Sequence, residues 1–147
     1  MRIPILIICA LLASAVVVAA QDDRQIGLVK TAQGEVFILR NGVRISAHPG
    51  SGLVLGDVLS TGTTGSLGVL LQDDTILSLG PSTETRIEQF VFEPAKQKLG
   101  MLLRVSRGLI AYVSGRISKL SPDSVRIETP VATLGIRGTC LVARIAP

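Results

Sequence analysis

Two glycines flank an arginine in ATLGIRGT, residues 132–139, near the end of the 147-residue chain. Gly135 and Gly138 remove side chains where a backbone turns or where another strand lies very close. The guanidinium of Arg137 presents five donors in a fixed fork, which suits bidentate pairing with a carboxylate or capping of backbone carbonyls. The segment therefore predicts a tight β corner that holds Arg137 in a defined place.

Two roles are open to Arg137 in such a corner. It can be a buried or half-buried brace, and Asp57 and Glu128 are then its candidate partners. It can instead recognise an anionic ligand or the carboxylate of a partner protein. A side chain inside a corner is poorly placed to meet a partner, so we expect the brace.

The chain offers little from which to build a catalytic centre. His48 is the only histidine, and it lies beside Pro49 in a polar loop. Without a histidine partner or a credible nucleophile neighbour, it is expected to be a solvated loop residue rather than a general base. A single histidine with Cys140 also lacks the paired spacing of zinc ligands. We therefore predict no enzymatic activity and no cofactor.

Asp73 and Asp74 are adjacent carboxylates, which can share a hard cation such as calcium. No Asp-x-Asp-x-Asp-Gly loop surrounds them, so the calcium interpretation lacks its usual ligand set. The pair separates two apolar runs in SLGVLLQDDTILSLG, where a hairpin turn explains both residues. We expect a turn there and no metal site.

The first twenty residues, MRIPILIICALLASAVVVAA, place one arginine before a long apolar run that ends in small residues. This is the layout of a secretory signal peptide, with cleavage predicted after Ala20. The protein is then periplasmic or secreted, and it contacts the membrane only if the segment stays uncleaved as an anchor. Residues 21–25 form a polar lead-in, and residues 26–147 form a single domain.

Cleavage would leave Cys140 as the only cysteine, because Cys9 lies in the apolar leader. No intrachain disulfide is then available, and Cys140 is buried, free or paired between chains. We expect it to be buried, since small apolar thiols pack well in cores. A disulfide between two copies is the alternative role.

Charge is spread along the chain, with 15 Lys plus Arg against 11 Asp plus Glu and only 3% aromatic residues. A nucleic-acid surface needs a basic stripe or a stacking platform, and the sequence shows neither. Binding of DNA or RNA is therefore not expected.

The elements that must position these residues are strands. Short apolar runs alternate with Gly, Pro, Asn, Asp and Ser, and none keeps helical spacing. Asn41-Gly42 predicts a type I′ hairpin between residues 36–40 and 43–47. Arg107-Gly108 separates two further predicted strands. About nine or ten short strands are predicted, an all-β fold arranged as a sandwich or as a β-helix-like stack.

Two stretches of the chain resemble the FecR-type domain, named for the ferric-citrate regulator of bacterial envelopes. TPVATLGIRGT matches a terminal T-P-x-A-x-x-G-x-R-G-T signature, and GLVLGDVLSTGTTG resembles an earlier stretch that contains G-D and T-G pairs. The resemblance covers roughly residues 26 to 145. The matching positions, which we expect to be structural, are Gly56, Asp57, Thr61, Gly62, Thr129, Pro130, Ala132, Gly135, Arg137, Gly138 and Thr139.

The resemblance implies a periplasmic module that binds a protein partner. Regulators of this family combine a cytoplasmic anti-sigma segment, one membrane span and a periplasmic domain that receives a signal from an outer-membrane siderophore receptor. This chain has no room for the cytoplasmic part, so the anti-sigma role is not carried over.

Two departures from the family pattern are informative. Asp74 stands where the family commonly has a turn glycine, which should strain that hairpin slightly. Family members also continue past the signature with further strands, so the strand from Leu141 to Ile145 is expected to be an unpaired edge that can recruit another chain. A domain truncated at this end is the competing explanation. Self-association through this edge, as a structural envelope protein, is the alternative function.

Overall fold

The computed structural model describes residues 24–146, so the predicted leader and its cleavage site lie outside the described residues. Within them the chain is almost entirely β, which confirms the predicted all-β class. The strands are β1 (Gln25–Gln33), β2 (Val36–Arg40), β3 (Val43–Ser46), β4 (Gly52–Val54), β5 (Val58–Thr61), β6 (Ser66–Leu71), β7 (Ile76–Leu79), β8 (Glu84–Glu93), β9 (Lys98–Val113), β10 (Val125–Glu128), β11 (Thr133–Gly135) and β12 (Cys140–Ile145).

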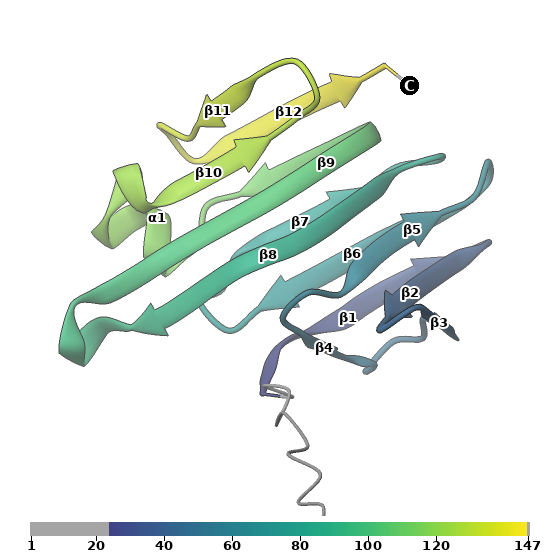
Figure 1. Ribbon diagram of the computed structural model, residues 1–147, viewed down its shortest axis with the longest axis horizontal. Helices are drawn as coiled ribbons and strands as arrows, with labels where there is room; N and C mark the ends of the chain where they lie inside the picture. The colour runs from purple at the N-terminus through teal and green to yellow at the C-terminus, as the bar shows by residue number, and fades with distance from the viewer. Residues whose placement is uncertain (1–23, 147) are drawn as a thin grey trace, which may run out of the picture.

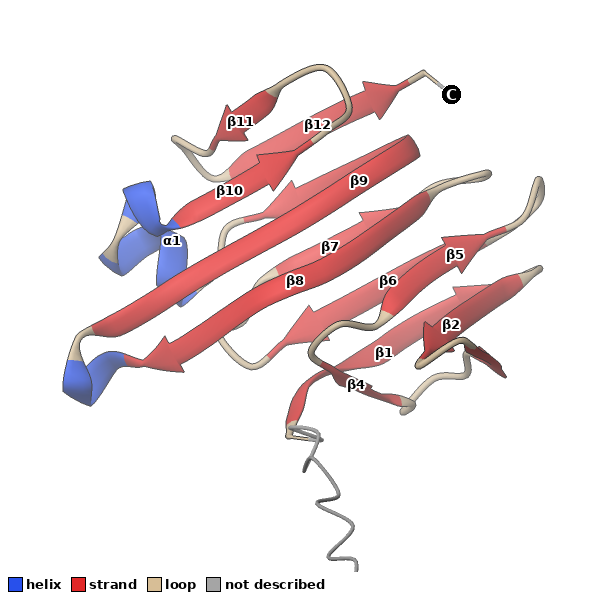
Figure 2. Cartoon of the chain, in the orientation of Figure 1, coloured by secondary structure: helices blue, strands red, loops and turns tan. Residues whose placement is uncertain are grey.

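Three short helical segments complete the described chain: α1 (Arg116–Leu120) and the 3-10 turns η1 (Pro94–Lys96) and η2 (Pro122–Ser124). They lie at the same end of the molecule (Figure 2). The described strands number twelve rather than nine or ten. The difference arises mainly because β4 and β11 have only three residues each, too few to stand out from the turns beside them in the sequence.

The strands form one curled sheet that doubles over into two layers (Figure 1). One layer has the order β3-β2-β5-β8-β9-β10-β11, and the other has the order β4-β1-β6-β7-β9-β12. Among the described strands only the β9–β10 pair is parallel. Of the two architectures left open by the sequence, this antiparallel arrangement fits a sandwich rather than a parallel β-helix-like stack.

Strand β9 belongs to both layers. Its first part pairs with β8 and β10, whereas residues 108–113 pair with β12 and the last four of them with β7. The prediction of two separate strands around Arg107-Gly108 is therefore wrong. Gly108 has a φ of +105°, which only glycine adopts readily, so the strand changes layer there without ending.

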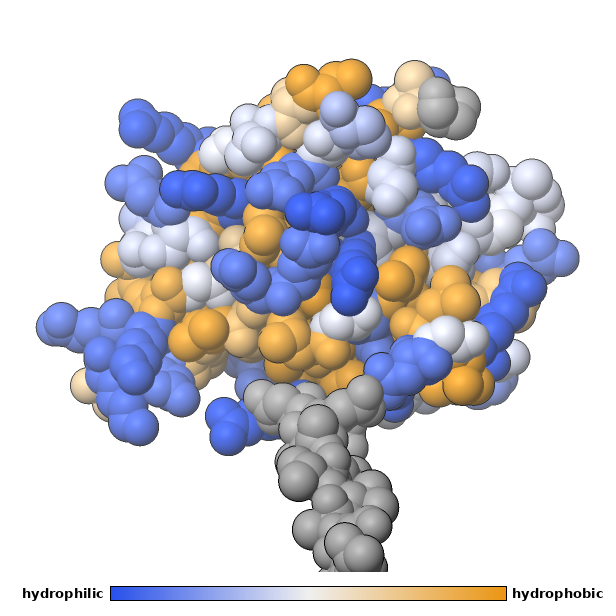
Figure 3. All heavy atoms as spheres, viewed as in Figure 1, coloured by the Kyte–Doolittle hydropathy of each residue, from blue (hydrophilic) through white to orange (hydrophobic). Residues whose placement is uncertain are grey.

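The core lies between the two layers and is filled by side chains that alternate along the strands. β6 and β7 bury every second residue, and fully buried side chains from both layers include Val29, Leu59, Leu103 and Ile110. This alternation is the pattern expected of strands with one face on a core. Apolar side chains also reach the surface above the β10–β11 turn (Figure 3), where Val131 is 91% exposed.

Both predicted hairpin turns are present. Asn41 and Gly42 have φ values of +53° and +76°, as a type I′ turn requires, so the β2–β3 hairpin is confirmed. The Asp73-Asp74 segment joins β6 to β7. Asp74 adopts a φ of +68°, which supports the expectation that a glycine would suit this position better.

Replacing Asp74 with glycine should raise the free energy of unfolding by about 0.5 kcal/mol, because relief of the left-handed backbone outweighs the extra freedom of glycine in the unfolded chain. The exposed Asp74 side chain loses little by its removal. Asp74→Ala, which keeps a Cβ and loses the local hydrogen-bonding capacity of aspartate, should be less stable than the parent chain. Urea denaturation of the three proteins measures the order, and an alanine variant as stable as the glycine variant would contradict this explanation.

Candidate functional site

The residues of the family signature fall at separate places in the fold. Gly56 and Asp57 form the turn between β4 and β5, and Thr61 and Gly62 follow at the end of β5. The other seven lie from the β10–β11 turn to the start of β12. The described structure therefore does not bring the two stretches together into one pocket.

Asp57 is a buried carboxylate, with 1% of its surface exposed, and it pairs with Arg40 at the end of β2. The Nε and Nη2 atoms of Arg40 donate to its two oxygens at 3.0 and 2.8 Å, and the N–H of Val54 donates to Oδ2 at 3.0 Å. Arg40 also donates to the carbonyl of Gly52 at 3.0 Å. This bidentate pair fixes the β4–β5 turn, in which Gly56 has a φ of +88°.

A cavity of about 560 Å³ opens beside this ion pair. Its charged lining comes from Arg40, Asp57, Glu84 and Arg86, so both signs of charge meet there. Glu84 pairs with Arg107, and Asp57 is already occupied by Arg40. The cavity thus borders an ion pair that organises the turn.

Thr61 and Gly62 join β5 to the β7–β8 connection. The buried hydroxyl of Thr61 donates to the carbonyl of Gly80 at 2.6 Å and accepts the N–H of Thr83 at 2.9 Å. A Cβ at Gly62 would lie 2.8 Å from the Cβ of Glu35, which is closer than real side chains approach. Hydrogen bonds therefore explain the threonine at position 61, and close packing explains the glycine at position 62.

The β10–β11 hairpin carries the first part of the terminal signature. The N–H of Thr129 donates to the carbonyl of Ala132 at 2.8 Å, and the Thr129 hydroxyl accepts the N–H of Ala132 at 3.0 Å. Pro130 follows Thr129, at a turn position where no N–H is needed. This closed turn precedes the segment 132–139, in which the sequence predicts the corner that seats Arg137.

The loop from β11 to β12 carries the second part. Ile136 is buried, and the carbonyls of Gly138 and Thr139 accept the hydroxyl and the N–H of Ser114 at 2.7 and 2.8 Å. Gly138 has a φ of +112°, so its glycine is required by the backbone. Gly135 has an ordinary φ, and a Cβ there would meet nothing within 4 Å. The expectation for Gly138 is confirmed, whereas the expectation that Gly135 marks a turn or a close approach is wrong, because Gly135 ends β11 with open space beside it.

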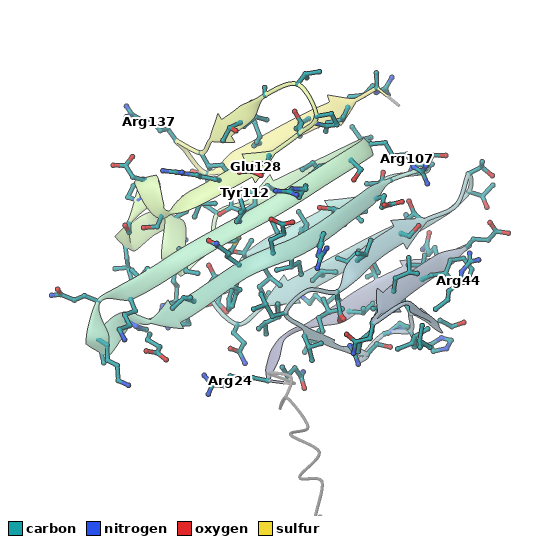
Figure 4. All side chains as sticks on the ribbon, viewed as in Figure 1. Arg24, Arg44, Arg107, Tyr112, Glu128 and Arg137 are labelled. Carbon is teal, nitrogen blue, oxygen red and sulfur yellow. The ribbon has the colours of Figure 1, made fainter. Side chains whose placement is uncertain are left out.

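Arg137 is exposed, and the brace prediction is wrong. Asp57 pairs with Arg40, and Glu128 pairs with Arg104 at 2.9 Å; within residues 24–146 no ion pair includes Arg137. The reason is the alternation of the chain, because Ile136 turns inward and Arg137 consequently turns outward. Figure 4 shows the Arg137 side chain pointing away from the sheet. It borders two open cavities, one beside α1 and the other beside η2 and β10.

Asp73 anchors α1. Its buried carboxylate accepts the N–H and the hydroxyl of Thr75 at 3.1 and 2.7 Å and the N–H of Ile117 at 3.2 Å. Its oxygens are thus used by donors of the chain itself, in agreement with the turn interpretation. Nearby, burial raises the pKa of the Tyr112 phenol above its ordinary value, and the Asp73 carboxylate adds to that rise.

His48 and Cys140 are both exposed. The position of His48 agrees with the prediction of a solvated loop residue, whereas Cys140 was expected to be buried. Cys140 begins β12, an edge strand whose side chains point alternately inward and outward, and its own side points outward. Within the described residues β12 pairs with β9 alone, as expected for an edge.

Several partners of these residues were not predicted. The sequence places Arg40 at the end of a hairpin strand, and nothing near it in the sequence indicates a pairing with Asp57. No pattern in the sequence singles out Ser114, Lys119 or Arg126. Only the fold brings them to the loop between β11 and β12.

In the part of the chain described, no three His, Cys, Asp or Glu side chains gather as a metal site would require. No helix among residues 24–146 is long and apolar enough for a membrane span.

Comparison with known proteins gives one family. The model of the family described as FecR protein matches residues 57–146, which is more than half of the chain and includes both Asp57 and the terminal signature. No curated protein and no solved structure matches the chain. The chain belongs to the FecR family.

Proposed function

We propose that this chain is an exported, non-enzymatic FecR domain that binds a protein partner as a regulatory module of the bacterial envelope. The observation that carries the proposal is the family match over residues 57–146, since FecR domains are associated with envelope signalling. The layout of the first twenty residues supports export, with cleavage after Ala20. The anti-sigma role is not part of the proposal.

A binding role rather than a catalytic one is supported by the way the described carboxylates are used. The buried Asp57 and Asp73 both accept hydrogen bonds that hold turns and α1 in place. His48 is exposed in a loop, and its hydrogen bond to the Ser51 hydroxyl, at 3.0 Å, comes from the backbone N–H and not from the imidazole. The β10–β11 hairpin, which carries the first part of the terminal signature, lies at the surface, where a partner can reach it.

The proposal is tested in the native envelope. The tagged full chain should be recovered from the periplasmic fraction with a new N-terminus after Ala20, and it should retain one protein partner reproducibly. Deletion of the gene should alter an envelope signalling response. Recovery of no partner together with an unchanged response would overturn the proposal.

Self-association is a second candidate, favoured by the free edge of β12. Val142 is 65% exposed on this strand, and Cys140 begins it with an exposed thiol. An unpaired edge is a template for another strand. The candidate function is then that of a structural envelope protein.

Cys140→Ser separates the two routes of self-association. If a disulfide links two copies, the parent chain should run as a dimer on a non-reducing gel and the variant as a monomer. If β12 edges pair, both proteins should elute as dimers from a sizing column. Monomers in every measurement would exclude both routes.

A further inference from the structure

Two cavities of about 520 and 460 Å³ adjoin at the end of β11. Both are lined by Pro122, Asp123 and Arg137, so they adjoin as an open groove between the α1–η2 segment and the loop that leads to β12. Figure 1 shows the end of β11 beside α1. We call this feature the signature groove, because Arg137 of the family signature lies at its middle.

The signature groove is basic. Its lining includes the exposed side chains of Lys119, Arg126 and Arg137 against the single carboxylate of Asp123. No ion pair within 4.0 Å joins any of these four residues to another described residue. By contrast, Arg104, which lies nearby on β9, is neutralised by two carboxylates. Three cations thus remain available to a ligand.

The two guanidinium groups start from fixed backbone positions. Arg126 lies on β10, between Leu102 of β9 and Gly135 of β11. Arg137 follows the buried Ile136 and precedes the two carbonyls that Ser114 holds. A ligand that pairs with these groups therefore has to order only their side chains, which lowers the cost of binding.

We propose that the signature groove binds the carboxylate side chains of an acidic segment of a protein partner. The inference rests on the proposed function and names the chemistry of the partner's contact. Arginine forks pair with carboxylates through two parallel hydrogen bonds, and no ion pair among the described residues occupies the fork of Arg137. The open backbone at Gly135 gives such a segment room to approach.

A peptide fits the groove better than a membrane does. Two adjoining cavities can hold successive side chains of an extended segment, whereas a flat bilayer cannot enter a concavity. Asp123 lines both cavities as well, and its carboxylate disfavours any anion placed directly beside it, whether on a lipid or on a peptide. Anionic lipid is therefore an outcome for the test to exclude.

The test uses fluorescence anisotropy with the mature chain and a labelled peptide in which glutamate alternates with serine. The parent chain should bind this peptide at low salt and should not bind the same peptide with glutamine in place of glutamate. Arg137→Gln should weaken binding about tenfold, the loss of one charge-assisted contact. Arg144→Gln removes an equal charge from an exposed arginine of β12 that is not part of the groove, and it should change the affinity by no more than about twofold.

Two further measurements test whether the loss of binding comes from the guanidinium fork and not from unfolding. Arg137→Lys, which keeps the charge and loses the fork, should bind with intermediate affinity. All variants should have the same melting temperature as the parent chain, because Arg137 has no ion pair to lose among the described residues. Absent peptide binding, equal losses for Arg137→Gln and Arg144→Gln, or binding only to anionic phospholipid vesicles would overturn the proposal.

Capture of the partner from the periplasmic fraction separates this inference from the proposed function. Arg137→Gln should recover less partner than the parent chain, while Arg144→Gln should recover as much. Full recovery of the partner by Arg137→Gln would overturn the proposal that the signature groove binds it and would leave the proposed function intact. If the parent chain recovers no partner, the proposed function itself fails.

Discussion

Replacing Asp57 with alanine is expected to lower the free energy of unfolding by about 3 kcal/mol, near the lower end of the range for breaking a buried ion pair. The change leaves the guanidinium of Arg40 without its bidentate acceptor and the N–H of Val54 without its partner. Arg40 is 32% exposed, so water compensates part of the loss. Equilibrium urea denaturation measures the effect.

A double-mutant cycle isolates the pair. Arg40→Ala combined with Asp57→Ala should cost clearly less than the sum of the two single changes, because neither charge is then left unpaired. Glu128→Ala is the matched surface control, since it breaks an ion pair with the half-exposed Arg104 and should cost less than about 1 kcal/mol. Equal costs for Asp57→Ala and Glu128→Ala would show that burial does not strengthen the pair.

The local features of this fold could be predicted from the sequence. Asn41-Gly42 specifies a type I′ turn through its own backbone preferences, and the Asp73-Asp74 turn follows from two flanking apolar runs. The all-β class follows likewise from alternation within each strand. These features depend on neighbouring residues, which a sequence displays directly.

The long-range features could not be predicted. Arg40 and Asp57 are separated by two further strand segments, and no local signal indicates that they meet. Glycine often marks a turn, so the sequence predicts two separate strands around Arg107-Gly108. In the structure the same glycine lets β9 continue into the other layer. Whether the strand ends or bends at this glycine depends on the strands that pair with β9 beyond it, and these are distant in the sequence.

The candidate site was half predictable. The signature drew attention to Arg137, but a charge between two glycines fits a corner brace as well as an exposed ligand contact. The order of Ile136 and Arg137 decides between them, because only one of two successive side chains can face the core. Lys119 and Arg126 reach the groove through α1 and β10, and only the three-dimensional fold shows this.

Gly108→Ala should destabilise the domain by about 3 kcal/mol or more, through backbone strain and a steric clash together. A Cβ at this position would lie 2.4 Å from the Cα of Thr83, and rotation of a side chain cannot relieve contact with backbone. The φ of +105° is also unfavourable for alanine. Thermal and urea denaturation should both show the loss.

Gly100→Ala provides the control within the same strand. A Cβ at Gly100 would meet nothing within 4 Å and its φ is not positive, so alanine should be neutral or should stabilise β9 by about 0.5 kcal/mol. Gly108 also pairs with Ile145 of β12, so the point where β9 changes layer helps to hold β12 in the sheet. Amide hydrogen exchange should therefore show lower protection in β12 for Gly108→Ala than for Gly100→Ala. Equal stability and equal protection in the two variants would mean that β9 changes layer without help from Gly108.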